Sequence, residues 1–313
     1  MTETRSAIPV VVVVGPTAAG KTAVAMEICR RFGGEVLSAD SMQIYRHMDI
    51  GTAKPTGGEQ ARVPHHLISI IDPDEHFSAA LYRERASEAA ATLRRRGRVV
   101  VLAGGTGLYV DALLGGLIEV PPADPELRAH FRREAEARGR EYLYNLLSER
   151  DALGASRIHP RDSVRIIRAL EVLELTGISI VRHQWKHDFR DGLYDCLKIG
   201  LAPEREELYR RINERANDMM DQGLAEEAHR LLQHDYAPSL PSMQAFCYRH
   251  VIQSLRGDIS SEEALGRLKR DTRNYAKRQI AWFKRDGEIH WFGPDGVEKI
   301  MALVSNFLSR TDV

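Results

Sequence analysis

Hydrophobic residues in the first third of the chain form short, uninterrupted runs separated by amphipathic stretches. The run Val10–Val14 is five consecutive valines, and such a β-branched run is typical of a strand buried on both faces of a sheet. Similar runs predict strands at 35–38, 67–71 and 99–102. Helical spacing predicts helices at 22–32 and 78–96. Strands that alternate with helices indicate a parallel sheet with helices on both faces.

The middle of the chain has a different pattern. Between about residues 121 and 184 there are few strand signals and many Arg, Glu and Ala residues. Asp124-Pro125-Glu126 is typical of a helix start, with an N-cap, a proline at the first position and an acid in the first turn. Apolar residues recur at helical spacing over 162–175. We predict that 121–184 is a helical insert between two parts of one core, 1–120 and 185–313.

The last part of the chain returns to the sheet pattern. It predicts strands at 196–201 and 289–292, with long helices at 204–221, 224–233 and 261–284. The expected fold is α/β, a P-loop NTPase-like parallel sheet with flanking helices and a helical insert domain.

The charges of the 313 residues balance. There are 44 Lys and Arg against 44 Asp and Glu, so the formal net charge is zero. This argues against a globally basic nucleic-acid coat protein and an acidic tail protein, but leaves room for a local basic face. The three cysteines, Cys29, Cys196 and Cys247, form no CxxC pair, which supports neither a disulfide framework nor a zinc site.

No segment reaches the ~18 apolar residues that span a bilayer. Residues 1–7 lack the apolar stretch of a signal peptide. We therefore expect a cytoplasmic protein that does not bind membranes, and we also expect a monomer.

Residues 15–22 match the pattern G-x-x-x-x-G-K-[ST], with a buried strand before them and a helix after. The loop consists of Gly15, Pro16, Thr17, Ala18, Ala19, Gly20, Lys21 and Thr22. Glycines let the backbone wrap closely around an anion, and the amides at the helix start favour negative charge. Lys21 adds a mobile cation, and the Thr22 hydroxyl can hold Mg²⁺. The motif predicts a polyphosphate site without specifying ATP.

An ATP-using enzyme also needs a carboxylate, usually at the end of a buried strand. Asp40 and Asp72 each end a predicted strand, although neither strand is long and plainly central. The strand at 99–102 is followed by glycine and threonine with no acid, and the chain has no N-K-x-D guanine-binding pattern. These features weaken an NTPase interpretation.

Further motifs follow the P-loop in order, as far as about residue 285. They are SADSMQIY at 38–45, MDIGTAKP at 48–55, PHHL at 64–67, GGTGLY at 104–109, RALE at 168–171, and YAKRQ at 275–279 with WF at 282–283. Together with the P-loop, this set resembles the tRNA dimethylallyltransferase family. The resemblance implies transfer of a dimethylallyl group from dimethylallyl diphosphate to the exocyclic amine of the adenosine just 3′ of the tRNA anticodon. The P-loop would then hold the diphosphate of the prenyl donor.

The chemistry of the acceptor singles out Asp40. An exocyclic adenine amine is a poor nucleophile, because its lone pair is delocalised into the ring. A carboxylate that accepts its hydrogen bond raises the electron density on nitrogen and takes up the proton. Asp40 ends a strand near the P-loop, and the matching residue of the family has this role. The structural alternatives are a helix N-cap or a Mg²⁺ ligand through water.

The leaving diphosphate gains charge as the C–O bond breaks, so its stabilisation is the main electrostatic task. Lys21, the P-loop amides and Mg²⁺ supply most of it. The Thr106 hydroxyl could donate to the oxygen that bridges carbon and phosphorus, or Thr106 could simply fill a tight turn. The family pattern adds a cation from the helix after the fifth strand. Arg211 and Arg215 share one face of that helix, and we favour Arg215; a solvated helix face is the alternative for either.

The tRNA base must turn out of its stack to reach a buried donor, and RNA sequence is mostly read on unstacked loop bases. Asp40 and Gln43 can serve these two purposes. The family positions that face tRNA correspond here to Asp40, Ser41, Met42, Gln43, Thr106, Arg128, Val164, Arg165, Ile166, Ile167, Arg168, Ser242, Met243, Gln244, Ala245, Phe246 and Cys247. The pair Phe246-Cys247 departs from the small Ile-Gly or Val-Gly of the family.

A basic segment near the C-terminus extends the expected tRNA surface. Residues 266–285 contain eight Lys or Arg against one acid, and residues 157–168 contain four Arg against one. Such clusters fit a phosphate-binding surface, with Lys277 and Arg278 as candidates. The alternative is a solvated helix face.

Three other functions share some of these features. A free-nucleotide prenyltransferase would have the P-loop and the Asp but would need neither the insert nor the basic helix. A small-molecule or nucleotide kinase would turn over ATP and use Asp40 or Asp72 for Mg²⁺. A non-enzymatic RNA-binding P-loop protein would not depend on Asp40.

Overall fold

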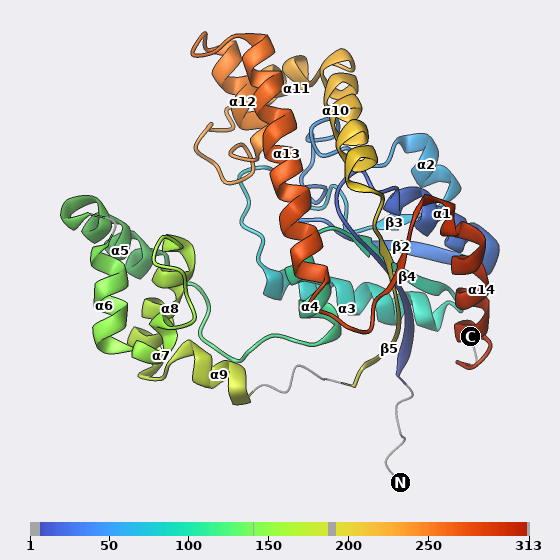
Figure 1. The fold of residues 1–313 in the computed structure, drawn as a ribbon, viewed down its shortest axis with the longest axis horizontal. Coiled ribbons are helices and arrows are strands. Elements are labelled where there is room, and N and C mark those ends of the chain that lie inside the picture. Colours follow the sequence, from blue (N-terminus) through green and yellow to red (C-terminus); the bar gives the residue numbers. More distant parts are fainter. Residues whose placement is uncertain (1–6, 140, 187–191, 312–313) are drawn as a thin grey trace. The chain divides into compact units, whose positions relative to one another are not determined.

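The computed structural model describes residues 7–139, 141–186 and 192–311, so residues 1–6 of the N-terminal segment 1–7 lie outside the described residues. The chain forms two compact units. One consists of 1–114 together with 192–313, and the other is Gly115–Asp191, drawn as the green helices of Figure 1. The second unit extends beyond the predicted insert, 121–184, at both ends.

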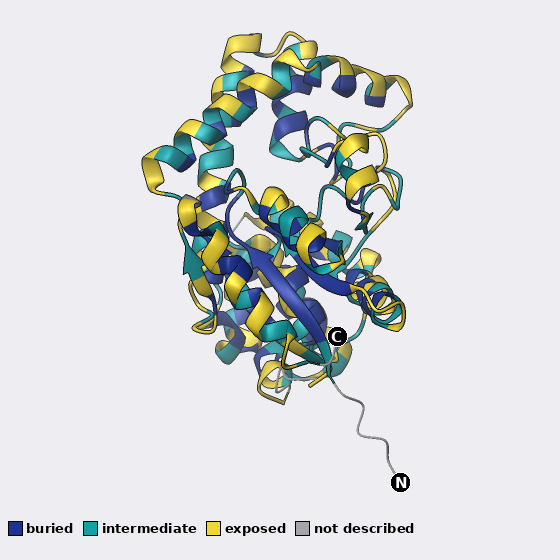
Figure 2. Ribbon diagram, turned by 90° about the vertical axis from the view of Figure 1, so that its right-hand side faces the viewer, coloured by how far each residue is buried: buried dark blue, intermediate teal, exposed yellow. Residues whose placement is uncertain are grey.

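The larger unit contains a six-stranded sheet in the order β3-β2-β4-β1-β5-β6. All neighbouring strands are parallel, which confirms the predicted α/β class. The strands are β1 (Ile8–Val14), β2 (Gly34–Ala39), β3 (His65–His66), β4 (Val99–Gly104), β5 (Tyr194–Leu201) and β6 (His290–Phe292). The valine run lies in β1 between β4 and β5 and is at most 1% exposed, as the dark blue strands of Figure 2 illustrate.

Alternate residues of β1 enter two separate cores, as expected for a strand covered on both faces. Val10, Val12 and Val14 pack with α3 (Ala79–Arg95) and α4 (Gly107–Leu114). Val11 and Val13 pack with α1 (Lys21–Phe32) and α14 (Val297–Leu308). The sheet is therefore a middle layer, and its carboxyl edge is left for the loops that follow each strand.

The predicted strand at 67–71 is wrong. The strand in this region is β3, His65–His66, and Leu67 and Ser69 have φ of 62° and 52°, in a left-handed region that strands do not use. Instead of joining the sheet, Ser69 and Ile70 donate backbone hydrogen bonds to the carbonyls of Gln43 and Ile44, at 2.9 and 2.8 Å. The apolar residues in this run pack against the loop after β2.

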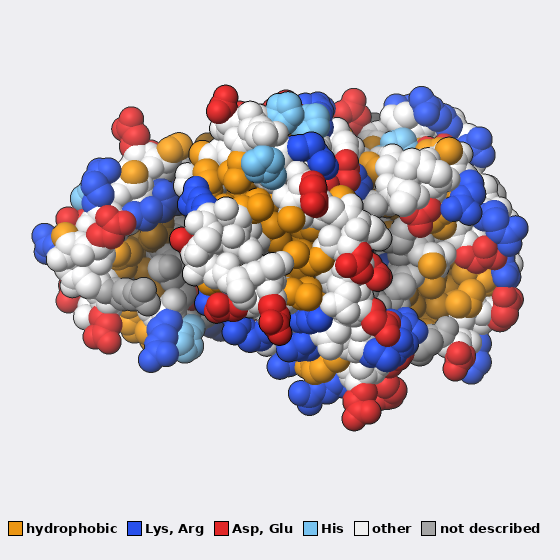
Figure 3. Space-filling model, turned by 90° about the horizontal axis from the view of Figure 1, so that it is seen from above, with side chains coloured by type: hydrophobic (Ala, Val, Ile, Leu, Met, Phe, Trp, Pro, Cys, Tyr) orange, Lys and Arg blue, Asp and Glu red, His pale blue; other side chains and the backbone are white. Residues whose placement is uncertain are grey.

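Further helices of this unit form a third core with the loop after β2. They include α10 (Arg205–Asp221), α11 (Leu224–Gln233), α12 (Phe246–Leu255) and α13 (Ser261–Phe283), and a short α2 (Gly57–Arg62) precedes β3. A 3₁₀ turn, Pro294–Gly296, precedes α14. Figure 3 shows acidic and basic side chains interspersed on the face seen from above, consistent with the zero net charge. Within the described residues, no helix has the length and apolar character to cross a membrane.

The smaller unit is helical. Its helices are α5 (Pro125–Arg138), α6 (Tyr142–Arg150), α7 (Ala152–Ala155), α8 (Ser163–Thr176) and α9 (Ile180–Lys186). Asp124 caps α5 by accepting a hydrogen bond from the Leu127 amide at 2.9 Å, with Pro125 at the first position. This is the helix start that the Asp-Pro-Glu sequence predicts.

Candidate active site

The P-loop connects β1 to α1, and three of its residues have left-handed backbone conformations. The φ angles are 143° at Gly15, 63° at Ala18 and 92° at Gly20. A Cβ at position 15 would lie 2.5 Å from the carbonyl oxygen of Leu201, so this position requires glycine. The first turn of α1 follows at once, and its free backbone N–H groups favour an anion.

Lys21 is the cation of this loop. Its Nζ donates a hydrogen bond to the Pro16 carbonyl at 2.8 Å, so the side chain lies back along the loop. Burial lowers the pKa of Lys21 to about 8, while nearby Asp40 raises it and nearby Arg215 lowers it. Thr22, the next residue, is exposed. An anion that enters the loop therefore meets a cation that loses its proton more easily than an ordinary lysine.

Asp40 follows β2 directly, and its two carboxylate oxygens differ. Oδ1 accepts hydrogen bonds from the amides of Met42, at 2.8 Å, and Gln43, at 3.3 Å. Over the part of the chain that the structure describes, Oδ2 has no hydrogen-bond partner. Residues 41–44 form a turn, so Oδ1 caps a turn and not a helix. These hydrogen bonds fix the side chain, and the other oxygen remains available.

Thr106 is tied to the loop that carries Asp40. Its Oγ1 accepts the Ser41 amide at 3.0 Å and donates to the Ser41 hydroxyl at 3.3 Å. Its own amide donates to the Ala39 carbonyl at 3.0 Å. The residue therefore joins the ends of β4 and β2, and its hydroxyl could donate to a ligand only by leaving the Ser41 hydroxyl.

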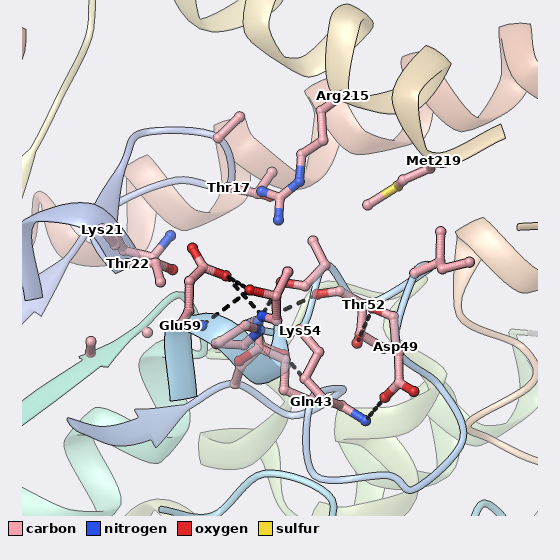
Figure 4. A pocket seen from close by; sticks show the side chains of 18 of the residues that line it. Thr17, Lys21, Thr22, Gln43, Asp49, Thr52, Lys54, Glu59, Arg215 and Met219 are labelled. Atoms are coloured by element: carbon pink, nitrogen blue, oxygen red, sulfur yellow. Dashed lines mark hydrogen bonds and ion pairs between the residues drawn. The ribbon is translucent and has the colours of Figure 1, made fainter. Parts of the chain in front are cut away.

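The two candidate arginines of α10 have different surroundings. Arg211 donates from Nε to Glu207 at 2.6 Å. Arg215 has no hydrogen-bond or ion-pair partner among the described residues, and Figure 4 shows its side chain reaching from α10 into the pocket. Burial lowers the pKa of Arg215, and Asp40 partly offsets this. Arg215 is thus the cation that is free to meet a ligand.

Lys21, Asp40, Arg211 and Arg215 line one cavity of about 930 Å³, whereas Thr106 is not among its lining residues. Its lining comes from the P-loop, the loop after β2, the segment before α2, and one face each of α10 and α13. Figure 4 shows Lys21 and Thr22 on the P-loop side, Arg215 and Met219 entering from α10, and Lys54 and Gln43 below them. Asp40 also lines the cavity, whereas Asp72 is not among its lining residues and pairs with Arg46 at 3.1 Å. The volume is in the usual range for small-molecule sites, about 300–1,000 Å³.

The wall formed by residues 49–54 depends on a buried carboxylate to which the sequence analysis gave no role. Glu227 is 3% exposed, and it accepts the amides of Asp49, Ile50 and Gly51 at 2.9 to 3.0 Å. The Tyr248 hydroxyl donates to the same carboxylate at 2.7 Å. Glu227 lies about 180 residues away in the sequence, so no local pattern signals this contact.

Two further residues that line the cavity, Lys54 and Tyr275, lie within the sequence motifs, but the motifs assign them no function. The Lys54 side chain, 4% exposed, donates to the Tyr45 carbonyl at 2.7 Å and to Asp49 at 2.5 Å. Tyr275 of α13 lines the cavity, and burial raises its pKa to about 12. Their presence in short motifs was the only available signal, since neither residue type specifies a role by itself.

The sequence model of the IPP transferase family matches residues 43–286. This chain belongs to that family. Relatives whose alignments cover nearly the whole chain support this family assignment. A protein named tRNA dimethylallyltransferase 2 from Syntrophus aciditrophicus is 50% identical over 298 residues, 95% of this chain and 96% of its own. A tRNA dimethylallyltransferase from Geobacter metallireducens is 48% identical over 298 residues, again 95% of this chain and 96% of its own.

A solved IPP transferase structure has the same fold. The tRNA isopentenylpyrophosphate transferase of Bacillus halodurans aligns with a TM-score of 0.72 at 38% identity, over 97% of this chain and 98% of that one. The chain therefore shares its fold with this solved relative.

Several positions expected to face tRNA have buried side chains in the larger unit. Met243 and Cys247 belong to the third core. Ser242 is 1% exposed and donates to the Pro73 carbonyl at 2.6 Å. In the same stretch Gln244 is exposed, and Ala245 and Phe246 are partly exposed.

The smaller unit also contains both buried and exposed members of the expected set. Ile166 and Ile167 lie in its hydrophobic core, 1% and 9% exposed, because they occupy the inward face of α8. On the outward face Val164 is 78% exposed, and Arg165 is exposed as well. The tRNA contact expected of this stretch stays a prediction, and Val164 and Arg165 are its exposed side chains.

Two arginines expected to face tRNA, Arg128 and Arg168, pair with a buried carboxylate. Glu171 is 0% exposed. Arg128 donates to it through two nitrogens at 2.8 and 2.9 Å, Arg168 pairs with it, and the Asp124 amide donates at 2.7 Å. Burial raises the pKa of Glu171, but these hydrogen bonds outweigh it and the pKa is lowered. The cluster fixes α5 against α8.

Proposed function

We propose that this protein transfers a dimethylallyl group from dimethylallyl diphosphate to the N6 amine of the adenosine 3′ of the anticodon in tRNA, and releases diphosphate. Relatives named tRNA dimethylallyltransferase support the reaction. The observation that carries the proposal for the site is that one cavity is lined by both the P-loop and Asp40. The reaction needs an anion site for the leaving group and a proton acceptor close to it.

On the donor side, the C–O bond breaks and the diphosphate keeps the electron pair. The P-loop amides, Lys21 and the unpaired Arg215 would stabilise that developing charge. Lys21 would exchange its hydrogen bond to the Pro16 carbonyl for one to a phosphate oxygen. Arg215 needs to break no ion pair, in contrast to Arg211. Thr106 would donate to the bridging oxygen after releasing Ser41.

On the acceptor side, a C–N bond forms while the amine loses a proton. Asp40 would accept a hydrogen bond from the amine through Oδ2 and take the proton as the new bond forms. Its Oδ1 is fixed by two backbone amides, so the carboxylate is already oriented. The side chain is therefore already ordered before the substrate binds, and binding does not need to restrict its rotation.

The P-loop residues fit a hard divalent cation such as Mg²⁺. The exposed Thr22 hydroxyl is an oxygen donor at the start of α1, and Mg²⁺ in such sites completes its shell with substrate phosphates and water. Bound there, it would neutralise charge on the departing diphosphate. Within 7–139, 141–186 and 192–311, no cluster of three or more His, Cys, Asp or Glu is placed to hold a metal ion.

The tRNA surface would include the exposed residues of the predicted set. Lys277 and Arg278 lie exposed on α13, and Arg278 is 5.7 Å from the ring centroid of Tyr275, which lines the cavity. In the smaller unit, Val164 and Arg165 would contact RNA from the outer face of α8.

The proposed reaction is tested by mass spectrometry of tRNA nucleosides after incubation with dimethylallyl diphosphate and Mg²⁺. We expect an adenosine heavier by one dimethylallyl group at the position 3′ of the anticodon, and released diphosphate. ATP as the control donor and AMP as the control acceptor separate this reaction from a kinase and from a free-nucleotide prenyltransferase. An unmodified tRNA, with either control reacting instead, contradicts the proposal.

A further inference from the structure

Gln279 connects two parts of the cavity wall that are distant in the sequence. It lies on α13 and is 5% exposed. Its Oε1 accepts the amide of Thr17, in the P-loop, at 2.8 Å. Its Nε2 donates to the carbonyl of Gly105, at the end of β4, at 2.9 Å. One buried amide therefore uses its acceptor on one segment and its donor on the other.

Each partner lies beside a group with a proposed role. Thr17 precedes Ala18, whose φ of 63° is unfavourable for a residue with a Cβ, so the loop needs support at this point. Gly105 precedes Thr106, and a Cβ at position 105 would lie 2.1 Å from Gln279 Nε2. The glycine thus leaves the space that the amide fills, and the two residues fit as a pair.

We propose that Gln279 is a positioning residue for the transfer step. It holds the P-loop and the β4 end at a fixed separation, so that the anion cradle and Thr106 act on the same diphosphate. This inference rests on the proposed function. A residue needed only to fill space would not require both ends of an amide, whereas here each end satisfies a backbone group of the cavity wall.

Two variants separate the two hydrogen bonds. Gln279→Met keeps a similar volume and loses both bonds. Gln279→Glu keeps an acceptor for the Thr17 amide, but it replaces the donor to the Gly105 carbonyl with an oxygen. The matched control is Gln233→Met, the same change at an exposed position on α11. Circular dichroism and the melting temperature establish that each variant is folded.

The measurements are kcat and KM for dimethylallyl diphosphate, KM for tRNA, and the Kd of inorganic diphosphate by calorimetry with Mg²⁺. For Gln279→Met we expect the Kd of diphosphate to rise about tenfold and kcat to fall by at least as much, the loss of one to two hydrogen bonds, with KM for tRNA unchanged. For Gln279→Glu we expect a larger rise in Kd, because a carboxylate beside the P-loop repels the diphosphate, and a comparable fall in kcat. The control should match the unsubstituted protein.

Two results would overturn the inference. Folded variants with unchanged donor kinetics and diphosphate affinity would show that Gln279 does not position the P-loop. A fall in both donor and tRNA parameters together with a lower melting temperature would show a purely structural role. If Gln279→Met does not fold, the donor kinetics and diphosphate affinity of Gln279→Glu test the inference. Failure of the proposed function is distinguishable, because the unsubstituted protein would then leave tRNA unmodified while diphosphate binding could still be compared.

Discussion

Donor binding should weaken above pH 8 through the titration of Lys21. The burial of this side chain beside Arg215 holds its pKa at about 8 in the free protein, against about 10.4 for an ordinary lysine. The charged form is the one that binds diphosphate, so affinity is lost as pH rises through 8. If the bound state keeps Lys21 protonated, the apparent Kd rises by the factor 1 + 10^(pH − 8), about twofold at pH 8 and about 11-fold at pH 9.

The assay is the Kd of dimethylallyl diphosphate by calorimetry from pH 7 to pH 9.5 at constant ionic strength. Lys21→Ala is the control, because its Kd reports only the ionisation of the ligand and of other groups. We expect the Kd of Lys21→Ala divided by the Kd of the unsubstituted protein to fall toward one as pH rises. Only the unsubstituted protein should take up protons on binding near pH 8. A ratio that stays constant over this range would refute the reasoning.

The contribution of Lys21 to the free energy of unfolding has the opposite pH dependence. Because the pKa of Lys21 is lower in the folded than in the unfolded state, the unfolded state binds more protons between about pH 8 and pH 10.4. The contribution of Lys21 to the free energy of unfolding therefore rises with pH across this window, while binding weakens. Thermal melting at each pH separates the two trends.

Three further substitutions test the site. Asp40→Ala should lower single-turnover transfer by about 10²–10⁴ while tRNA binding changes little, and unchanged transfer would reject the role as proton acceptor. Arg215→Ala should reduce kcat by about 10² or more, and Arg211→Ala much less; equal effects would contradict the assignment to the unpaired arginine. Replacing Lys277 and Arg278 by Ala together should weaken tRNA binding and reduce the slope of log K against log salt by about 1.4, which an unaltered slope in filter binding would disprove.

The elements that the sequence predicts correctly are those with a local cause. The valine run of β1 and the P-loop are read from adjacent residues, as is the Asp-Pro start of α5, because burial, phosphate binding and capping each require particular residue types at fixed spacing. The strand predicted at 67–71 is wrong because the conformation of this segment has no local cause. Its apolar content is real, but the left-handed φ of Leu67 and Ser69 reflects contacts with the loop after β2, which no local pattern displays.

The predicted tRNA surface shows a different limit. A resemblance identifies which stretches belong together but not which side chain of each stretch faces outward. In α8 the helical period places Val164 outside and Ile166 inside. Arg128 and Arg168 have the charge of RNA-binding residues, yet both pair with Glu171. Whether a charge serves a partner molecule or a buried counter-ion depends on a tertiary neighbour.

The cavity itself is assembled from both ends of the chain. The N-terminal 60 residues supply the P-loop, Asp40 and the wall at 49–54, but two buried polar side chains from the C-terminal part hold them in place: Gln279 on the P-loop and Glu227 on residues 49–51. Each satisfies backbone groups that would otherwise be buried without partners, at a cost of about 1–3 kcal/mol for each group. The N-terminal motifs can therefore name the chemistry, while the geometry in which they perform it depends on α11 and α13, more than 170 residues away.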